Sequence, residues 1–138
     1  MKKILLIILT ILLYPGYFYL YGQSNQFDQF KGSFTNYDIN SEQAVLNKIE
    51  ADTDPKTENV ILDGIALKFE YIDYSLIYYS DIYKVLPVSF SDQKKDRYVF
   101  DYYVDYEKVV KIVLVMKKGE IINKQVFPEK KDTDPKGK

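Results

Sequence analysis

The chain has 138 residues, with 19 basic and 20 acidic side chains and a formal net charge of −1, and it contains neither cysteine nor histidine. These absences rule out disulfide bonds and the Cys–His and Ser–His nucleophile systems, and they argue against a structural zinc site. Charges of both signs are interspersed, which argues against nucleic-acid binding because that needs a concentrated basic surface. We expect no cofactor and no metal, since no catalytic motif or ligand cluster stands out.

The N-terminal segment predicts export. Lys2 and Lys3 precede an apolar run over residues 4–13, and a Pro-Gly pair and an aromatic stretch follow before Gly22. A cationic head with a short apolar stretch is typical of a secretion signal. Cleavage near Gly22 is one outcome, because the apolar run is about half of the roughly 20 residues that span a bilayer. Retention as an anchor is the other, because residues 4–21 carry no charge and their tyrosines suit a membrane interface.

With residues 1–22 set apart as signal peptide or anchor, residues 23–128 have the length of one α+β domain, and the charged tail at 129–138 is expected to be disordered. The part before residue 38 is polar but carries aromatic side chains at helical spacing, namely Phe27, Phe30, Phe34 and Tyr37. We expect a loosely helical or irregular segment there.

A helix is predicted to begin at Asn40, which acts as N-cap with Gln43 three residues later in a capping box. Its buried stripe comprises Ala44, Val45, Leu46 and Ile49. It ends before the segment Ala-Asp-Thr-Asp-Pro at 51–55, because Pro55 disfavours helical geometry at Asp54.

From residue 60 the apolar pattern changes to period two. Residues 60–62 and 65–72 predict a hairpin with the favoured Asp-Gly turn, whose second arm turns Ile65, Leu67, Phe69 and Tyr71 to one face. Residues 74–86 fit helical spacing, but their tyrosine and isoleucine content favours a strand, so we predict an extended segment. Pro87 would confine a strand there to an edge or a bulge.

The C-terminal part predicts a three-stranded antiparallel meander over residues 97–106, 109–116 and 121–127. In the predicted register Tyr102 pairs with Val110 and Phe100 with Ile112, and Asp101 lies opposite Lys111. The chain therefore predicts an α+β fold, with one capped helix, or two helices, packed on an antiparallel sheet of five or six strands.

Nine tyrosines occur between residues 71 and 106. The plain interpretation is that they are good strand residues that fill the sheet. The functional one is a contact surface, because tyrosine offers a large area with a polar tip. Where two tyrosines are adjacent, only one can point inward, which singles out Tyr79 and Tyr103. Together with Tyr83 and Tyr106 they are the candidate binding residues.

Three other patterns also have a plain and a functional interpretation. Asp-Thr-Asp-Pro-Lys occurs at 52–56 and 132–136, where a solvated turn is favoured because a calcium loop needs further oxygen ligands. Carboxylates near aromatic residues are either solvated or an acid–base pair, and these are Glu70, Asp73, Asp101 and Asp105. The basic clusters at 94–97 and 117–118 keep hairpin tips soluble, or bind an anionic lipid head group.

Three functions remain open at this point. The first is an exported, periplasmic or secreted, non-enzymatic binding or inhibitory protein whose partner in the envelope is a protein or a small apolar ligand. The second is an accessory subunit anchored in the membrane, which requires that residues 4–21 be retained. The third is a small enzyme on a cone-shaped α+β scaffold with an aspartate and a tyrosine in an internal pocket.

Overall fold

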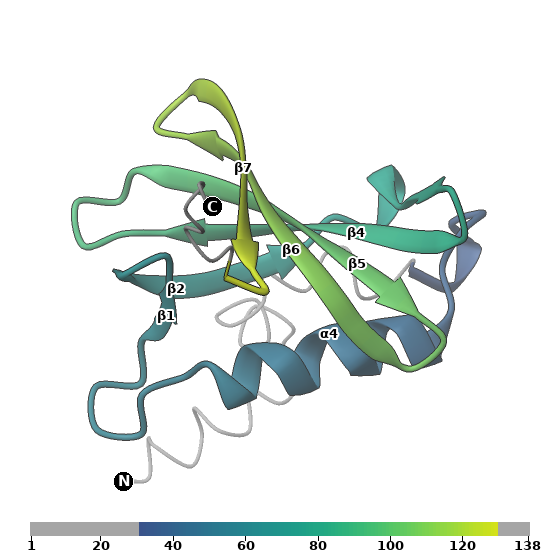
Figure 1. Ribbon diagram of the computed structural model, residues 1–138, viewed down its shortest axis with the longest axis horizontal. Helices are drawn as coiled ribbons and strands as arrows, with labels where there is room; N and C mark the ends of the chain where they lie inside the picture. The colour runs from purple at the N-terminus through teal and green to yellow at the C-terminus, as the bar shows by residue number, and fades with distance from the viewer. Residues whose placement is uncertain (1–30, 130–138) are drawn as a thin grey trace, which may run out of the picture.

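One helix, α4 (Ile39–Ala51), lies across one face of a curled antiparallel sheet in the computed structural model, which describes residues 31–129 (Figure 1). The strands are β1 (Val60–Leu62), β2 (Ile65–Ile72), β3 (Tyr78–Ser80), β4 (Tyr83–Ser91), β5 (Arg97–Asp105), β6 (Lys108–Lys117) and β7 (Glu120–Phe127). There are two single 3-10 turns: η2 (Lys31–Ser33) precedes the helix, and η3 (Tyr74–Leu76) follows β2. The sheet order is β1-β2-β4-β5-β6-β7, with β3 paired to β4.

The α+β class, the first hairpin and the C-terminal meander are confirmed. The sheet has seven strands rather than five or six, because the ambiguous stretch before residue 87 supplies both β3 and the start of β4. The predictions for residues 1–22, 23–30 and 130–138 lie outside the described residues. None of the helical segments between residues 31 and 129 combines the length and the hydrophobicity that a bilayer-spanning helix requires.

The helix begins two residues earlier than predicted. Asp38, not Asn40, is the N-cap: it has extended backbone geometry, and its Oδ1 accepts the N–H of Ser41 at 2.8 Å. Asn40 lies inside the first turn. Asp38 takes the cap because Lys84 on the neighbouring sheet and the Ser41 hydroxyl also hold its carboxylate. The predicted stripe of Ala44, Val45 and Ile49 is buried, with Leu46 partly so.

The Asp63-Gly64 turn of the first hairpin has positive φ at both residues, as the predicted two-residue turn requires. Further along β2, the pairing with β4 shifts between Phe69 and Tyr71. This bulge places Ile72 in the core and leaves Tyr71 beside Arg97, so the prediction that Tyr71 shares the face of Leu67 and Phe69 is wrong.

Pro87 lies within β4, which has strand partners on both sides, so of the two predicted positions, an edge or a bulge, the edge is wrong. On one side of β4, β3 pairs with residues 83–85 and β2 with residues 88–91. The Pro87 carbonyl accepts the N–H of Asp73 at 2.8 Å, so its side lacking an N–H faces the interval where the chain turns through η3. No ladder bond is lost there, which is why the sheet accepts a proline.

The β5–β6 register differs by two residues from the prediction. Tyr102 pairs with Ile112, Phe100 with Leu114 and Asp101 with Val113, so Lys111 lies opposite Tyr103 instead of Asp101. A two-residue turn fixes Asp105 opposite Lys108, and a register shift at Tyr103/Val104 adds one position. Because the difference is an even number, Phe100, Tyr102 and Ile112 still face the core. The predicted core position of Val110 is wrong, because the shift at Tyr103/Val104 places Val109 in the core instead.

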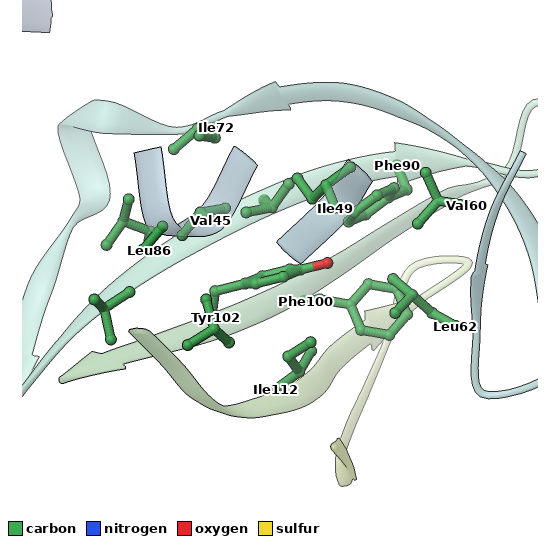
Figure 2. Close-up of a cluster of buried hydrophobic side chains, with 14 of the residues drawn as sticks. Val45, Ile49, Val60, Leu62, Ile72, Leu86, Phe90, Phe100, Tyr102 and Ile112 are labelled. Atoms are coloured by element: carbon green, nitrogen blue, oxygen red, sulfur yellow. The ribbon is translucent and has the colours of Figure 1, made fainter. Parts of the chain in front are cut away.

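The core fills the space between α4 and the concave side of the sheet. Figure 2 shows Val45 and Ile49 of the helix close to Leu86, Phe90, Phe100 and Tyr102 of the central strands. The rings of Phe90 and Phe100 meet edge to face, with centroids 5.4 Å apart. At the open side of the curl, Lys124 of β7 forms an ion pair with Asp63 of the first hairpin at 3.1 Å.

Candidate functional site

The four candidate tyrosines lie in two separate pairs. Tyr83 and Tyr103 pack edge to face on the side of the sheet away from the helix, with ring centroids 6.2 Å apart. Tyr79 is 60% exposed and Tyr106 is 90% exposed, and both line a hollow at the end of the sheet where α4 begins. The structure therefore brings together two of the predicted residues at one site and the other two elsewhere.

This hollow, which we call the tyrosine hollow, has a volume of about 870 Å³. It lies between the first turn of α4, the β3–β4 turn and the β5–β6 turn. Its lining residues are Asp38, Asn40, Ser41, Tyr79, Ile82, Lys84, Val104, Asp105, Tyr106 and Glu107. The β3–β4 turn contributes Ile82, which is 69% exposed and was not predicted from the sequence. The signal that could have found it is an isoleucine in a turn, where polar residues are usual.

Two charged residues in the tyrosine hollow neutralise each other. Lys84 Nζ donates to Asp38 Oδ2 and stands 5.2 Å from the centroid of the Tyr79 ring. Burial alone would raise the pKa of Asp38, but its hydrogen bonds to Lys84 and Ser41 outweigh this and lower it. Burial would lower the pKa of Lys84, whereas Asp38 and Tyr79 raise it. Both groups are therefore charged at neutral pH.

Tyr106 has an unusual backbone conformation for its size. It opens the two-residue β5–β6 turn with φ of +62°, in the left-handed region that favours glycine or asparagine. The other non-glycine residues with positive φ within residues 31–129 are charged or asparagine: Glu58, Asp63, Asp81, Lys95, Lys118 and Asn123. An aromatic side chain at this position costs about 1 kcal/mol of conformational energy and gains no burial in return. Such a combination is typical of a functional position.

The carboxylates considered for acid–base chemistry do not gather. Asp73 caps η3, and its Oδ1 accepts from the Ser75 hydroxyl at 2.7 Å. Glu70 accepts from Ser91 at 2.6 Å. Asp101 accepts from the Tyr78 hydroxyl at 2.8 Å on the face away from the helix, while Asp105 lies in the tyrosine hollow. The paired geometry that acid–base catalysis needs is therefore not formed by these four residues.

The other two patterns have structural roles at turns. In the first Asp-Thr-Asp-Pro-Lys copy, Asp54 Oδ1 accepts the N–H of Lys56 at 3.0 Å, and Oδ2 accepts from Thr57, which is the turn chemistry expected for aspartate. The second copy lies outside the described residues. The basic clusters come together at the opposite end of the sheet, where the Lys118 N–H donates to the Arg97 carbonyl at 2.9 Å.

Glu42 is a buried polar residue whose role the sequence did not reveal. Its carboxylate accepts hydrogen bonds from Lys31, Tyr37 and Tyr74, at distances of 3.0, 2.8 and 2.5 Å. Lys31 and Tyr74 are distant in sequence, so no local pattern indicates this cluster. In the part of the chain from 31 to 129, no group of three or more acidic residues is placed to hold a metal ion.

A second hollow, of about 650 Å³, lies between the β1–β2 turn and β7. It is lined mainly by polar groups, including the Lys124–Asp63 ion pair. The tyrosine hollow differs because it gathers exposed aromatic and aliphatic side chains. Comparison of the chain with protein-family models, curated proteins and solved structures gives no match.

Proposed function

We propose that the chain is an exported, non-enzymatic binding protein that holds a partner protein in the tyrosine hollow. Export is supported by the cationic and apolar N-terminal segment of the sequence. Binding is supported by the exposed side chains of Tyr79, Ile82 and Tyr106 around one concave surface. Tyrosine is enriched in protein interfaces, since its ring buries a large area and its hydroxyl remains able to bond.

The observation that carries the proposal is Tyr106. An exposed aromatic residue in a left-handed turn conformation contributes little to folding, so its presence is best explained by contact with a partner. A binding role is favoured over catalysis because the candidate carboxylates lie in separate environments. A protein partner is favoured over a small apolar ligand because the hollow is open and lined by charged residues at its rim.

Site-specific photocrosslinking in the producing cells tests this proposal. A photoreactive amino acid at position 82 is expected to give a defined protein adduct, recovered from outside the cytoplasm. The matched control is position 121, because Ile121 is also 69% exposed but lies on β7. Adducts at both positions or at neither, or an adduct only in the cytosol, would contradict the proposal.

Tyr106→Asn sharpens the same test. Asparagine accepts the left-handed conformation, so the free energy of unfolding should rise by about 1 kcal/mol. The adduct from position 82 should at the same time fall at least tenfold, which corresponds to about 1.4 kcal/mol of binding. Urea unfolding and adduct yield are the two measurements. A variant that loses both stability and binding would assign Tyr106 a structural role only.

A further inference from the structure

The charges around the tyrosine hollow are unbalanced. Its lining includes three carboxylates, Asp38, Asp105 and Glu107, against one ammonium, that of Lys84. Lys84 is already paired with Asp38. Asp105 pairs with Lys108 across the β5–β6 turn through the backbone, but within residues 31–129 neither Asp105 nor Glu107 forms an ion pair. The rim formed by this turn is therefore acidic.

Tyrosine rings of the protein already lie within cation–π distance of lysine ammonium groups. Lys84 Nζ lies 5.2 Å from the Tyr79 ring centroid, within the range of a cation–π interaction. On the other face of the sheet, Lys111 Nζ stands 4.2 Å from the Tyr103 ring. In the tyrosine hollow, Tyr106 presents a second ring with almost no contact to the rest of the protein. A cation from outside can therefore meet a tyrosine ring and a carboxylate within the same hollow.

The other lining residues suit the stem of a long basic side chain. Ile82 and Val104 supply aliphatic surface between the charged groups. Arginine and lysine bury their methylene groups on such surface while the charged end stays near acceptors. A neutral apolar ligand would instead remove water from Asp105 and Glu107 without compensation, which is unfavourable. An anionic ligand would be repelled by the same groups.

We propose that the tyrosine hollow takes an arginine or lysine side chain of the partner protein, with Asp105 and Glu107 pairing its charge and Tyr106 contacting it through its ring. This inference rests on the proposed function, since it names the chemistry of the partner at the same site. Arginine suits the site particularly well, because its planar guanidinium both stacks on a tyrosine ring and bonds a carboxylate through two N–H groups.

The test uses two five-residue peptides as probes, added to the isotopically labelled full chain. One carries a single arginine between leucines, and the other carries citrulline, the neutral analogue of arginine, at the same place. The arginine peptide is expected to shift the NMR signals of Ile82 and Glu107 in a saturable way. The citrulline peptide should bind about fivefold more weakly or worse, because it cannot form the charge-assisted hydrogen bonds. Added salt should reduce this difference, because exposed charges are screened.

Carboxylate substitutions test whether Asp105 and Glu107 cause the preference for the arginine peptide. Asp105→Asn combined with Glu107→Gln should bring the arginine peptide to the affinity of the citrulline peptide. Glu120→Gln, which removes an exposed carboxylate at the far end of the sheet, should leave the difference unchanged. Equal binding of the two peptides, or no shift at Ile82 and Glu107, would overturn the inference. The proposed function would survive that outcome, because the adduct from position 82 does not depend on the charge of the partner.

Discussion

Two carboxylates are buried in different parts of the molecule, and their pKa values move in opposite directions. Glu42, in the first turn of α4, is 6% exposed, and Asp101, on the face of β5 away from the helix, is 9% exposed. Burial raises the pKa of Glu42, but hydrogen bonds from Tyr74, Lys31 and Tyr37 outweigh it and the pKa is lowered. Burial also raises the pKa of Asp101, where the single bond from Tyr78 does not compensate.

Burial alone therefore does not set the charge state of a side chain in this fold. Glu42 has three donors, one of them a cation, so its charged form is better stabilised in the protein than in water. Asp101 has one neutral donor, so its charged form is poorly compensated. The first carboxylate should stabilise the folded state at neutral pH, and the second should weaken it.

Glu42→Gln should change the stability of the protein most. The substitution removes the charge that Lys31 and two tyrosines surround, and it leaves the Lys31 ammonium without its carboxylate. The free energy of unfolding at pH 7 should fall by about 3 kcal/mol. Glu50→Gln is the matched control, since Glu50 lies on the same helix but is exposed.

The stability that Glu42 contributes should depend on pH in a defined direction. Because the folded pKa of Glu42 is lowered, its contribution is present above the unfolded value of 4.5 and is lost as the pH falls through the folded pKa. Urea unfolding at pH 7 and in the acidic range should therefore show a stability difference between wild type and variant that shrinks with acid. A difference that stays constant with pH would assign the loss to packing.

Much of the fold could be predicted from the sequence, for local reasons. The Asp63-Gly64 turn, the period-two runs of β2 and β5 and the β-branched run of β6 specify their hairpins within a few residues. The bulges at Phe69/Tyr71 and Tyr103/Val104 could not be predicted, because packing on the core decides them and no local pattern marks them. The N-cap was misplaced for a similar reason, since Lys84 from β4 helps to hold Asp38.

The candidate site was predicted only in part. Tyrosine density indicated Tyr79 and Tyr106, but it could not separate them from Tyr83 and Tyr103, which lie on the other face of the sheet. The separation depends on how the β3–β4 and β5–β6 turns meet the start of α4. The Glu42 cluster joins residues from three segments, so only the folded arrangement reveals it.

Asp101→Asn should have a smaller effect than Glu42→Gln and of opposite sign. The folded pKa of Asp101 is raised above 3.8, so its contribution is full below that value and is lost as the pH rises through the folded pKa. Asparagine keeps an acceptor for Tyr78 and carries no charge, so the variant should be more stable than wild type at pH 7 by about 1 kcal/mol.

The difference in the free energy of unfolding between Asp101→Asn and wild type should disappear at pH 3, where the wild-type carboxyl group is protonated in the folded state. Urea midpoints at the two pH values measure it. A variant that is less stable than wild type at pH 7 would contradict the proposed cost of the charge. In that case Asp101 and Tyr78 would resemble the Glu42 cluster, and the contrast between the two regions would disappear.

Removing the Tyr102 hydroxyl should change stability least. This group extends the comparison to a buried polar group that has no hydrogen-bond partner. Its hydroxyl is the one buried side-chain polar atom within residues 31–129 that lacks a hydrogen-bond partner, and Figure 2 shows its oxygen among hydrophobic side chains. Tyr102→Phe removes this group, so the free energy of unfolding should stay the same or rise by up to about 1 kcal/mol. Tyr74→Phe is the counterpart, because it removes a donor to Glu42 and should lower stability by about 1–2 kcal/mol. Urea unfolding of both variants measures the two changes in stability. If removing the Tyr102 hydroxyl lowers the free energy of unfolding as much as removing that of Tyr74, hydrogen-bond partners do not determine how buried polar groups affect stability in this protein.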